Sequence, residues 1–432
     1  MRPRNQRREI PNDNTKTHFH STGPGILAVL QFEIDMPRTL LLSEIFPPTH
    51  GGSGRWFWEI YRRFSQDRLT CLVGEHSEQA AFDVTHTMDV VRTNLSQKEW
   101  GFIRPTGWKQ YLGNLKKIRR IVRDRGIDRI QCGRCLPEGW LAWLAKHTIG
   151  VPYECYVHGE DVETAACSRE LRWMVRRVLA SADRLIANSR NTASLLEGQW
   201  QIPSDRITVL HPGVDTQRFH PVEHSDVARQ KLGWRHRTVI LTVGRLQRRK
   251  GQDMMIQALP IIRDAIPNVL YAIVGDGEER ESLEELAKSL DVQDRVQFLG
   301  GVDDATMISA YQQCDLFALP NRTVGRDIEG FGMVLLEAQA CGRPVLAGNS
   351  GGTAETMKIG KTGVIVPCET SGPLAEAVAK LLLDPHTLDE MGAAGREWVT
   401  TNFDWDSLAI KASRLFFSDA ETALAVHEQS VP

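Results

Sequence analysis

The sequence lacks a charge excess, a membrane-length apolar run and a repeat, and each absence excludes a class of protein. Lys and Arg number 52 against 54 Asp and Glu, which gives a formal net charge of -2. Proteins that neutralise nucleic-acid phosphates usually carry a clear basic excess. No stretch has the roughly 20 consecutive apolar residues of a membrane-spanning helix. We therefore expect neither a nucleic-acid partner nor a bilayer-spanning chain.

The eight cysteines also lack the spacing of a metal site or a disulfide framework. One Cys-x-x-Cys occurs, at Cys132 and Cys135, without a second pair or a histidine at ligand distance along the sequence. Most of the others lie in apolar segments, as is typical of reduced, buried thiols in the cytosol. We expect a cytoplasmic protein, either free or peripheral on the inner face of the plasma membrane.

What is present is an alternation of short apolar runs and amphipathic stretches, which is typical of parallel sheets with crossover helices. Strands are predicted at 40–43, 69–73, 127–131, 153–157, 184–187 and 208–210, and again at 239–243, 269–274, 296–299, 316–319, 344–347 and 363–366. Two similar series predict two similar domains.

Turn-rich sequence around residue 218 separates the two series and suits a hinge. We therefore predict a disordered leader at 1–35, a first Rossmann-like domain at 36–217 and a second at 218–400. The apolar helical pattern at 405–417 predicts that the segment 401–432 begins with a helix that crosses back to the first domain. The space between the two domains is the expected ligand site.

The densest chemical signal is a loop followed by a helix, with an acid at each end. Glu329 precedes Gly330 and Gly332, and a strong helix pattern from Met333 contains Glu337. A glycine turn that leads into a helix N-terminus presents free N–H groups to an anion such as a diphosphate. Eight residues of helix would separate the carboxylates by up to roughly 12 Å, too far for a glycosidase pair. The alternative is an ordinary helix with one surface and one partly buried Glu.

A basic turn follows the strand predicted at 239–243. Arg245 and Lys250 lie at the carboxyl end of this strand, where doubly wound folds bind phosphates. Guanidinium and ammonium groups both neutralise diphosphate oxygens. We select Arg245 and Lys250 and expect Arg248 and Arg249 to be solvated.

Two weaker patterns occupy the first half. Gly51 and Gly52 belong to a Gly-Gly-x-Gly turn after the first strand, which is as compatible with an ordinary tight turn as with a phosphate loop. His158 follows the strand at 153–157 and could contact a sugar hydroxyl or the transition state. Glu160 and Asp161 come next and are candidates for orienting an acceptor.

A third pattern, at 108–125, combines apolar residues at helical spacing with many cations. Such a helix could lie on an anionic membrane surface, or it could be a crossover helix with a solvated basic face. The segment 55–58, an arginine followed by three aromatic residues, has the same two interpretations.

Taken together, these residues resemble the retaining glycosyltransferases of the GT-B fold known as glycosyltransferase family 4, over roughly residues 37–417. The resemblance rests on the two glutamates, on the basic turn and on the hinge sequence ITVLHPGVD at 207–215. It implies an α/β fold with two doubly wound Rossmann-like domains that face each other across a cleft. It also implies metal-independent chemistry without a cofactor.

The resemblance further implies a role for each candidate residue. Arg245 and Lys250 would bind the diphosphate of a nucleotide-sugar donor, with Gly51 and Gly52 opposite. Glu337 would bind the ribose, and His158 would lie over the sugar. The remaining assignments place the hexose at Glu329 with the amides of Phe331, Gly332 and Met333, and the base near Asp276, Gly277 and Val302.

A narrower resemblance comes from the sequence at 320–342, which is similar to bacterial GDP-mannose-dependent phosphatidylinositol mannoside mannosyltransferases, with a shortened glycine-rich insert. It implies transfer of mannose to a lipid-linked or glycan acceptor. The alternatives are a UDP-sugar-dependent transferase of the same fold, a nucleotide-sugar epimerase or hydrolase, and a binding subunit without turnover.

Overall fold

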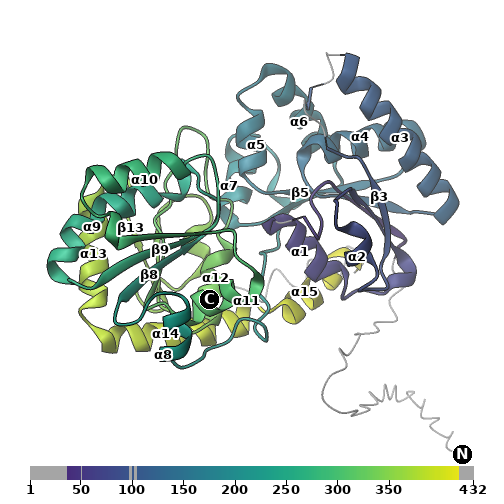
Figure 1. Ribbon diagram of the computed structural model, residues 1–432. Helices are drawn as coiled ribbons and strands as arrows, with labels where there is room; N and C mark the ends of the chain where they lie inside the picture. Colours follow the sequence, from purple (N-terminus) through teal and green to yellow (C-terminus); the bar gives the residue numbers. More distant parts are fainter. Residues whose placement is uncertain (1–36, 50, 97–99, 102–104, 418–432) are drawn as a thin grey trace, which may run out of the picture.

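The computed structural model describes residues 37–417 except 50, 97–99 and 102–104, so the predicted leader lies outside the described residues. Figure 1 shows two lobes side by side, each built on one sheet with helices packed around it. We call the lobe around the first sheet the first lobe and the other the second lobe.

The first lobe contains a seven-stranded parallel sheet in the order β3-β2-β1-β4-β5-β6-β7. Its central strands are buried along their whole length, which explains their continuous apolar sequences. The strands are β1 (Thr39–Ser43), β2 (Leu69–Gly74), β3 (Asp89–Thr93), β4 (Arg129–Cys132), β5 (Tyr153–Val157), β6 (Arg184–Ala187) and β7 (Ile207–Val209).

The second lobe repeats the plan with six parallel strands in the order β10-β9-β8-β11-β12-β13. Both sheets share the strand order of the Rossmann fold, so the predicted fold class is confirmed. The strands are β8 (Thr238–Val243), β9 (Val269–Val274), β10 (Val296–Gly300), β11 (Leu316–Leu319), β12 (Val345–Gly348) and β13 (Gly363–Val366).

Helices connect the strands and cover the sheets (Figure 1). The first lobe carries α1 (Gly52–Tyr61), α2 (Gln79–Asp83), α3 (Pro105–Arg125), α4 (Trp140–Ile149), α5 (Glu160–Ala165), α6 (Arg169–Ser181) and α7 (Arg190–Gly198). The second carries α8 (Asp226–Lys231), α9 (Gln252–Ala265), α10 (Arg280–Ser289), α11 (Asp304–Gln313), α12 (Met333–Ala340), α13 (Ser371–Leu382) and α14 (Pro385–Asn402), followed by α15 (Trp405–Phe417).

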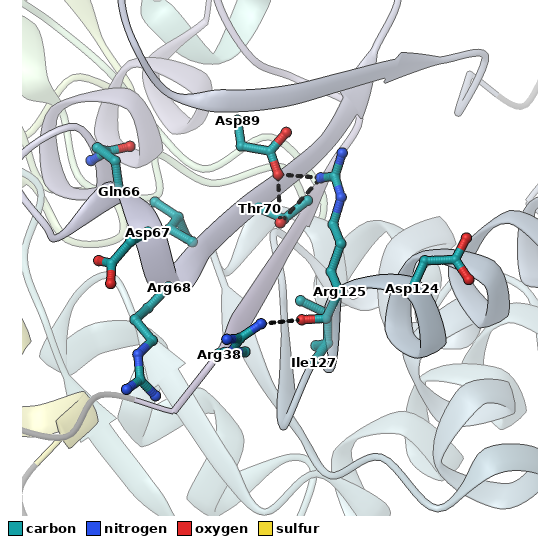
Figure 2. Close-up of a pocket in the computed structure, with 10 residues that line it drawn as sticks. Arg38, Gln66, Asp67, Arg68, Thr70, Asp89, Asp124, Arg125 and Ile127 are labelled. Carbon is teal, nitrogen blue, oxygen red and sulfur yellow. Dashed lines mark hydrogen bonds and ion pairs between the residues drawn. The ribbon is translucent and has the colours of Figure 1, made fainter.

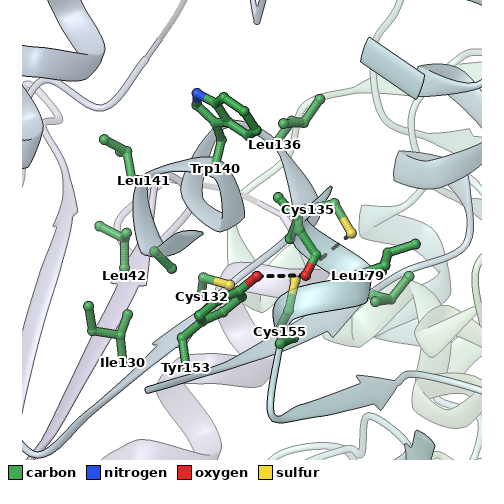
Figure 3. Packing of buried hydrophobic residues seen from close by; sticks show 14 of the residues in the cluster. Leu42, Ile130, Cys132, Cys135, Leu136, Trp140, Leu141, Tyr153, Cys155 and Leu179 are labelled. Carbon is green, nitrogen blue, oxygen red and sulfur yellow. Dashed lines mark hydrogen bonds between the residues drawn. The ribbon is translucent and has the colours of Figure 1, made fainter. Parts of the chain in front are cut away.

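The core of the first lobe contains three neighbouring thiols, shown in Figure 3. Cys132, Cys135 and Cys155 are buried and free, and the Sγ atoms of Cys135 and Cys155 lie 3.9 Å apart. Burial is the main cause that raises the pKa of Cys155 well above its ordinary value. These thiols are therefore protonated packing groups of the core.

Helix α15 packs on the first lobe although it follows the last strand of the second (Figure 1). Its side chains Trp405, Leu408 and Phe416 are buried in one cluster with residues of β1 and α1. Arg63 of the first lobe forms an ion pair with Asp406 at 2.6 Å. The chain thus passes between the lobes twice, and the two passages meet where the Val214 amide donates to the Phe403 carbonyl at 2.9 Å.

Candidate functional site

The candidate residues gather at the carboxyl ends of the strands, where the two lobes meet. In each sheet the strand order reverses beside the first strand, between β1 and β4 and between β8 and β11. Ligands of doubly wound folds bind at such points because two crossover loops diverge there. The turns after β1 and β5 in the first lobe, and after β8 and β11 in the second, carry the predicted glycines, histidine, cations and glutamates.

A cluster of opposite charges lies between the turn after β8 and the loop after β11. Lys250 Nζ and Arg249 Nη1 each donate to Glu329 Oε2 at 2.5 Å. All three side chains are about one-tenth exposed. Arg248 is exposed, as expected, but the expectation that Arg249 is solvated is wrong, because carboxylates from distant loops fold over it.

The cations keep Glu329 ionised in spite of its burial. Burial alone would raise the pKa of Glu329, but the charges of Lys250 and Arg249 and their hydrogen bonds outweigh it, so the pKa is lowered. A buried carboxylate with two charge-assisted hydrogen bonds is held firmly in one place. The site therefore contains a positioned anion next to two positioned cations.

Glu337 lies one turn inside α12 and is buried. Gly332 caps this helix with a φ of 94°, a left-handed conformation that glycine adopts without strain. Glu337 Oε2 accepts a hydrogen bond from the Tyr311 hydroxyl at 2.6 Å. Burial raises the pKa of Glu337, opposed by the charge of Arg55 from α1 and by the Tyr311 bond. Arg55, which belongs to the first lobe, is a cation that we did not select from the sequence.

The two lobes approach closely beside this helix. A Cβ atom on Gly52 would lie 3.3 Å from Met333 Sδ, and one on Gly330 would lie 2.6 Å from the His158 carbonyl oxygen. The His158 ring is fixed by a hydrogen bond of 2.7 Å between Nε2 and the Gly133 carbonyl. The structure thus brings Gly52 and His158 of the first lobe against the loop and helix that carry Glu329 and Glu337.

The two acceptor candidates have different surroundings. Glu160, the first residue of α5, has a half-exposed side chain and forms an ion pair with Arg249 Nη2 at 3.2 Å. Asp161 is buried, and its Oδ1 accepts from the backbone amides of His158 at 3.1 Å and Val162 at 2.9 Å. Asp161 therefore stabilises the turn after β5, whereas Glu160 belongs to the charged cluster.

The residues selected for the base and diphosphate lie on the neighbouring turns after β8, β9 and β10. The Leu246 amide donates to the Asp276 carbonyl at 3.1 Å, which ties the turn of Arg245 to that of Asp276 and Gly277. Asp276 Oδ2 accepts from the Gly301 amide at 2.7 Å, next to Val302. The Arg245 side chain is exposed. These turns lie side by side at the carboxyl ends of neighbouring strands in the second lobe, as does the turn that carries Arg249 and Lys250.

A further connection between the lobes was not predicted from the sequence. Glu355, after β12, accepts hydrogen bonds from the backbone amides of Arg190 and Asn191 at 2.7 and 2.9 Å and from His211 Nε2 at 2.9 Å. The amides belong to the first turn of α7, and the His211 ring stacks on Phe331 at 5.2 Å. Glu355 therefore links the first lobe to the loop of the candidate site.

A polar pocket of about 290 Å³ lies elsewhere, at the amino ends of strands in the first sheet (Figure 2). Arg125 pairs there with Asp89, and Arg38 donates to the Arg125 carbonyl at 3.0 Å. Arg125 and Arg38 are thus occupied by an acid and a carbonyl of the same pocket. It lies at the opposite end of the sheet from the candidate site.

Two Rossmann-type lobes that meet at the carboxyl ends of their strands have the architecture of the GT-B class of glycosyltransferases. The model for glycosyl transferases group 1 matches residues 225–398, and the model for glycosyltransferase family 4 matches residues 50–218. The GDP-mannose-dependent alpha-(1-6)-phosphatidylinositol monomannoside mannosyltransferase of Mycobacterium tuberculosis is 34% identical over 395 residues, which cover 89% of this chain and 99% of that protein. The chain therefore belongs to this glycosyltransferase family, and the predicted family is confirmed.

Other comparisons agree with this assignment. A monoacylated phosphatidylinositol monomannoside mannosyltransferase of Corynebacterium glutamicum is 32% identical, over 88% of this chain and 98% of that protein. The crystal structure of HepE from Anabaena in complex with UDP shares the fold, with a TM-score of 0.75, 22% identity, and coverage of 88% of this chain and all of that one. Sucrose-phosphate synthase from Thermosynechococcus elongatus has a TM-score of 0.72 at 22% identity, over 90% of this chain and all of that one.

Two kinds of feature are absent from the described residues. None of the described helices combines the length and apolar character needed to cross a bilayer. Among the described side chains, no group of three or more His, Cys, Asp or Glu residues is arranged to hold a metal ion.

Proposed function

We propose that the protein transfers mannose from GDP-mannose to a phosphatidylinositol-mannoside lipid with retention of configuration. The observation that carries the proposal is the buried cluster of Arg249, Lys250 and Glu329 at the lobe junction, opposite Gly52 and His158. The choice of donor and acceptor is supported by the names of relatives that match this chain over nearly its whole length.

Each candidate residue has a role in this proposal. Lys250 and Arg245 neutralise the diphosphate, and Gly51 and Gly52 approach it from the first lobe. Glu329 and the amides of residues 331–333 bind the hexose, Glu337 binds the ribose, and His158 lies over the sugar. The base rests near Asp276, Gly277 and Val302. Glu160 and Asp161 are the acceptor-side residues, with Asp161 acting through the turn that it stabilises.

The proposed mechanism is a front-face displacement. The bond between the anomeric carbon and the diphosphate oxygen breaks as the acceptor hydroxyl approaches from the same face. The leaving diphosphate takes the hydroxyl proton, and its growing charge is stabilised by Lys250, Arg245 and the free amides of α12. Donors that are already in place where charge develops lower a barrier most effectively, because they need no reorganisation.

The test is a donor screen with purified protein. We expect GDP to raise the melting temperature more than UDP does, and GDP-mannose with a phosphatidylinositol mannoside to give a longer mannolipid. A preference for UDP-sugars would assign the alternative donor class. Consumption of the donor without any acceptor would favour an epimerase or hydrolase. GDP binding without turnover would indicate a binding subunit.

A peripheral position on an anionic membrane is the second part of the proposal. Helix α3 buries Tyr111, Leu115 and Ile118 in the first lobe but leaves Trp108 and Leu112 45% and 43% exposed. Exposed cations lie beside them on this helix: Lys109, Lys116, Arg119, Arg120 and Arg123. Arg120 and Arg123 pair with the exposed Asp124, and Lys117 donates to Thr93 of the first lobe. The helix is thus a crossover helix whose free face has the composition of a membrane-surface helix. Trp56 and Phe57 are buried and contribute nothing to this face.

Vesicle sedimentation tests this surface. We expect binding to vesicles containing phosphatidylglycerol, weakened by salt and by the double substitution Trp108→Ser and Leu112→Ser. The matched control is Ile261→Ser on the second lobe, where an apolar side chain of similar exposure is removed. An equal loss of vesicle binding in both variants, or vesicle binding that does not depend on salt, would contradict the proposal.

Metal independence is tested by turnover in excess EDTA, which should equal turnover without it.

A further inference from the structure

Arg249 forms ion pairs with acids of both lobes at the candidate site, beside a second pair between the lobes, in which Arg326 Nη1 lies 3.3 Å from Glu163 of α5. The three nitrogens of Arg249 contact three carboxylates: Nη1 contacts Glu329 at 2.5 Å, Nε contacts Asp327 at 3.1 Å, and Nη2 contacts Glu160 at 3.2 Å. The guanidinium is planar and offers five donors in a fixed arrangement, so one side chain can bind acids in different directions.

The three acids come from both lobes. Asp327 and Glu329 lie in the loop between β11 and α12 of the second lobe, which the proposed function assigns to the donor sugar. Glu160 begins α5 of the first lobe, directly after His158 and Gly159. Arg249 therefore joins the loop of the donor sugar to the first-lobe turn next to the proposed acceptor.

Charge balance requires a second cation beside Lys250. Lys250 now pairs with Glu329 at 2.5 Å, but the proposed function also asks it to neutralise the donor diphosphate. If Lys250 turned to the phosphate alone, a buried Glu329 would be left without a counter-charge, which is strongly unfavourable. Arg249 remains on Glu329 in that state and keeps the acid ionised and in place.

We propose that Arg249 is a positioning residue that couples donor placement to acceptor binding, by holding Glu329 in the second lobe and Glu160 in the first at the same time. This inference rests on the proposed function and extends it to a residue outside the donor contacts. Arg249 acts through the two acids. When either contact is lost, the placement of the donor sugar is coupled less tightly to the acceptor turn, although Arg326 still pairs with Glu163, and water competes with the acceptor for the sugar.

A double-mutant cycle on the full chain tests the coupling. The variants are Arg249→Lys, Glu160→Gln and the two combined, with Arg248→Gln as the control in the same turn, since Arg248 is exposed. Each variant is assayed with GDP-mannose and a phosphatidylinositol mannoside for kcat, for the acceptor KM and for donor hydrolysis without transfer. Binding of GDP is followed by thermal shift.

We expect Glu160→Gln and Arg249→Lys each to raise the acceptor KM about tenfold and to increase hydrolysis, with GDP binding unchanged in Glu160→Gln. The double variant should be no worse than Arg249→Lys alone, because residues in one network are not additive. Arg248→Gln should match the wild type. Lysine keeps the charge at position 249 but lacks the planar guanidinium that contacts several acids at once. If the role of Arg249 were purely electrostatic, Arg249→Lys would stay active, and this result would overturn the proposal.

Other outcomes would also overturn it. If the rise in acceptor KM in the double variant equalled the product of the two single rises, the lobes would not be coupled through Arg249. An unchanged acceptor KM in Glu160→Gln would show the same. Glu160 is half-exposed, so Glu160→Gln gives an answer even if Arg249→Lys folds poorly. A wild type that uses another nucleotide sugar would contradict only the proposed donor, and the same cycle would then be run with that sugar.

Discussion

Replacement of Lys250 by methionine separates the role of this residue in catalysis from its role in folding. Methionine keeps an unbranched side chain of similar length and removes the ammonium group. Glu329 then loses one of two cations but keeps the Arg249 contact at 2.5 Å, so the acid is not left unpaired. The loss of folding stability should be about 1.5 kcal/mol, the size of one hydrogen bond to a charged group.

The effect on turnover should be much larger. Removing one group that stabilises developing charge costs about 2.7 to 4 kcal/mol in the transition state, which corresponds to about a hundredfold to a thousandfold loss in kcat. The assay is the initial rate with GDP-mannose and a phosphatidylinositol mannoside, together with urea unfolding of the same samples.

Arg248→Met is the matched control, because it removes a neighbouring exposed cation from the same turn. Its unfolding free energy should stay within about 0.5 kcal/mol of the wild type, and its turnover should be unchanged. Turnover of Lys250→Met within about fivefold of the wild type, with a normal melting temperature, would refute the assignment of Lys250 to the leaving diphosphate.

Three further predictions follow from contacts described above. Glu337→Ala should raise the donor KM about tenfold with kcat nearly unchanged, because a ribose contact is equal in ground and transition states; a selective loss of kcat would contradict this. Glu355→Gln should cost about 1 kcal/mol at neutral pH, as for a lost helix cap. Burial alone would raise the pKa of Glu355, but its three hydrogen bonds lower it from 4.5, so the stabilisation is complete above that pH and is lost as the pH falls further. Urea unfolding at neutral and acidic pH should show the difference from wild type vanish in acid, and a constant difference would be contrary evidence. Phe416→Ala should lower the unfolding free energy by about 3 to 5 kcal/mol, since this ring is 2% exposed; calorimetry would measure it, and a change below about 1 kcal/mol would show that α15 is not docked.

The sheets could be predicted from the sequence because central parallel strands are buried on both faces and read as apolar runs. The strands predicted at 153–157, 184–187, 269–274, 316–319 and 363–366 have the same bounds in the structure. Strand β3 was missed, because it lies at the edge of the first sheet and four of its five residues are only partly buried. An edge strand such as Asp89–Thr93 lacks the apolar run on which the prediction depends.

Some of the candidate site residues could be selected from the sequence because they stand in recognisable local patterns. Lys250 and Glu329 stand in local patterns, a basic turn and a glycine loop, that can be recognised in a short window. Arg249 and Glu355 cannot be recognised in this way, because their partners are distant in sequence: Glu160 and Glu329 lie 89 and 80 residues from Arg249. His211 lies 144 residues from Glu355. Only the tertiary structure shows that these charges are paired.

The docking of α15 on the first lobe also affects the order in which the two lobes can finish folding during synthesis. Trp405, Leu408 and Phe416 fill a cluster in the first lobe, so that lobe lacks part of its core until these residues have left the ribosome. Domains normally fold in the order of their synthesis. Here the amino-terminal half must wait for the carboxyl-terminal one, and expression of residues 37–217 alone would leave an apolar face of the first lobe open to solvent.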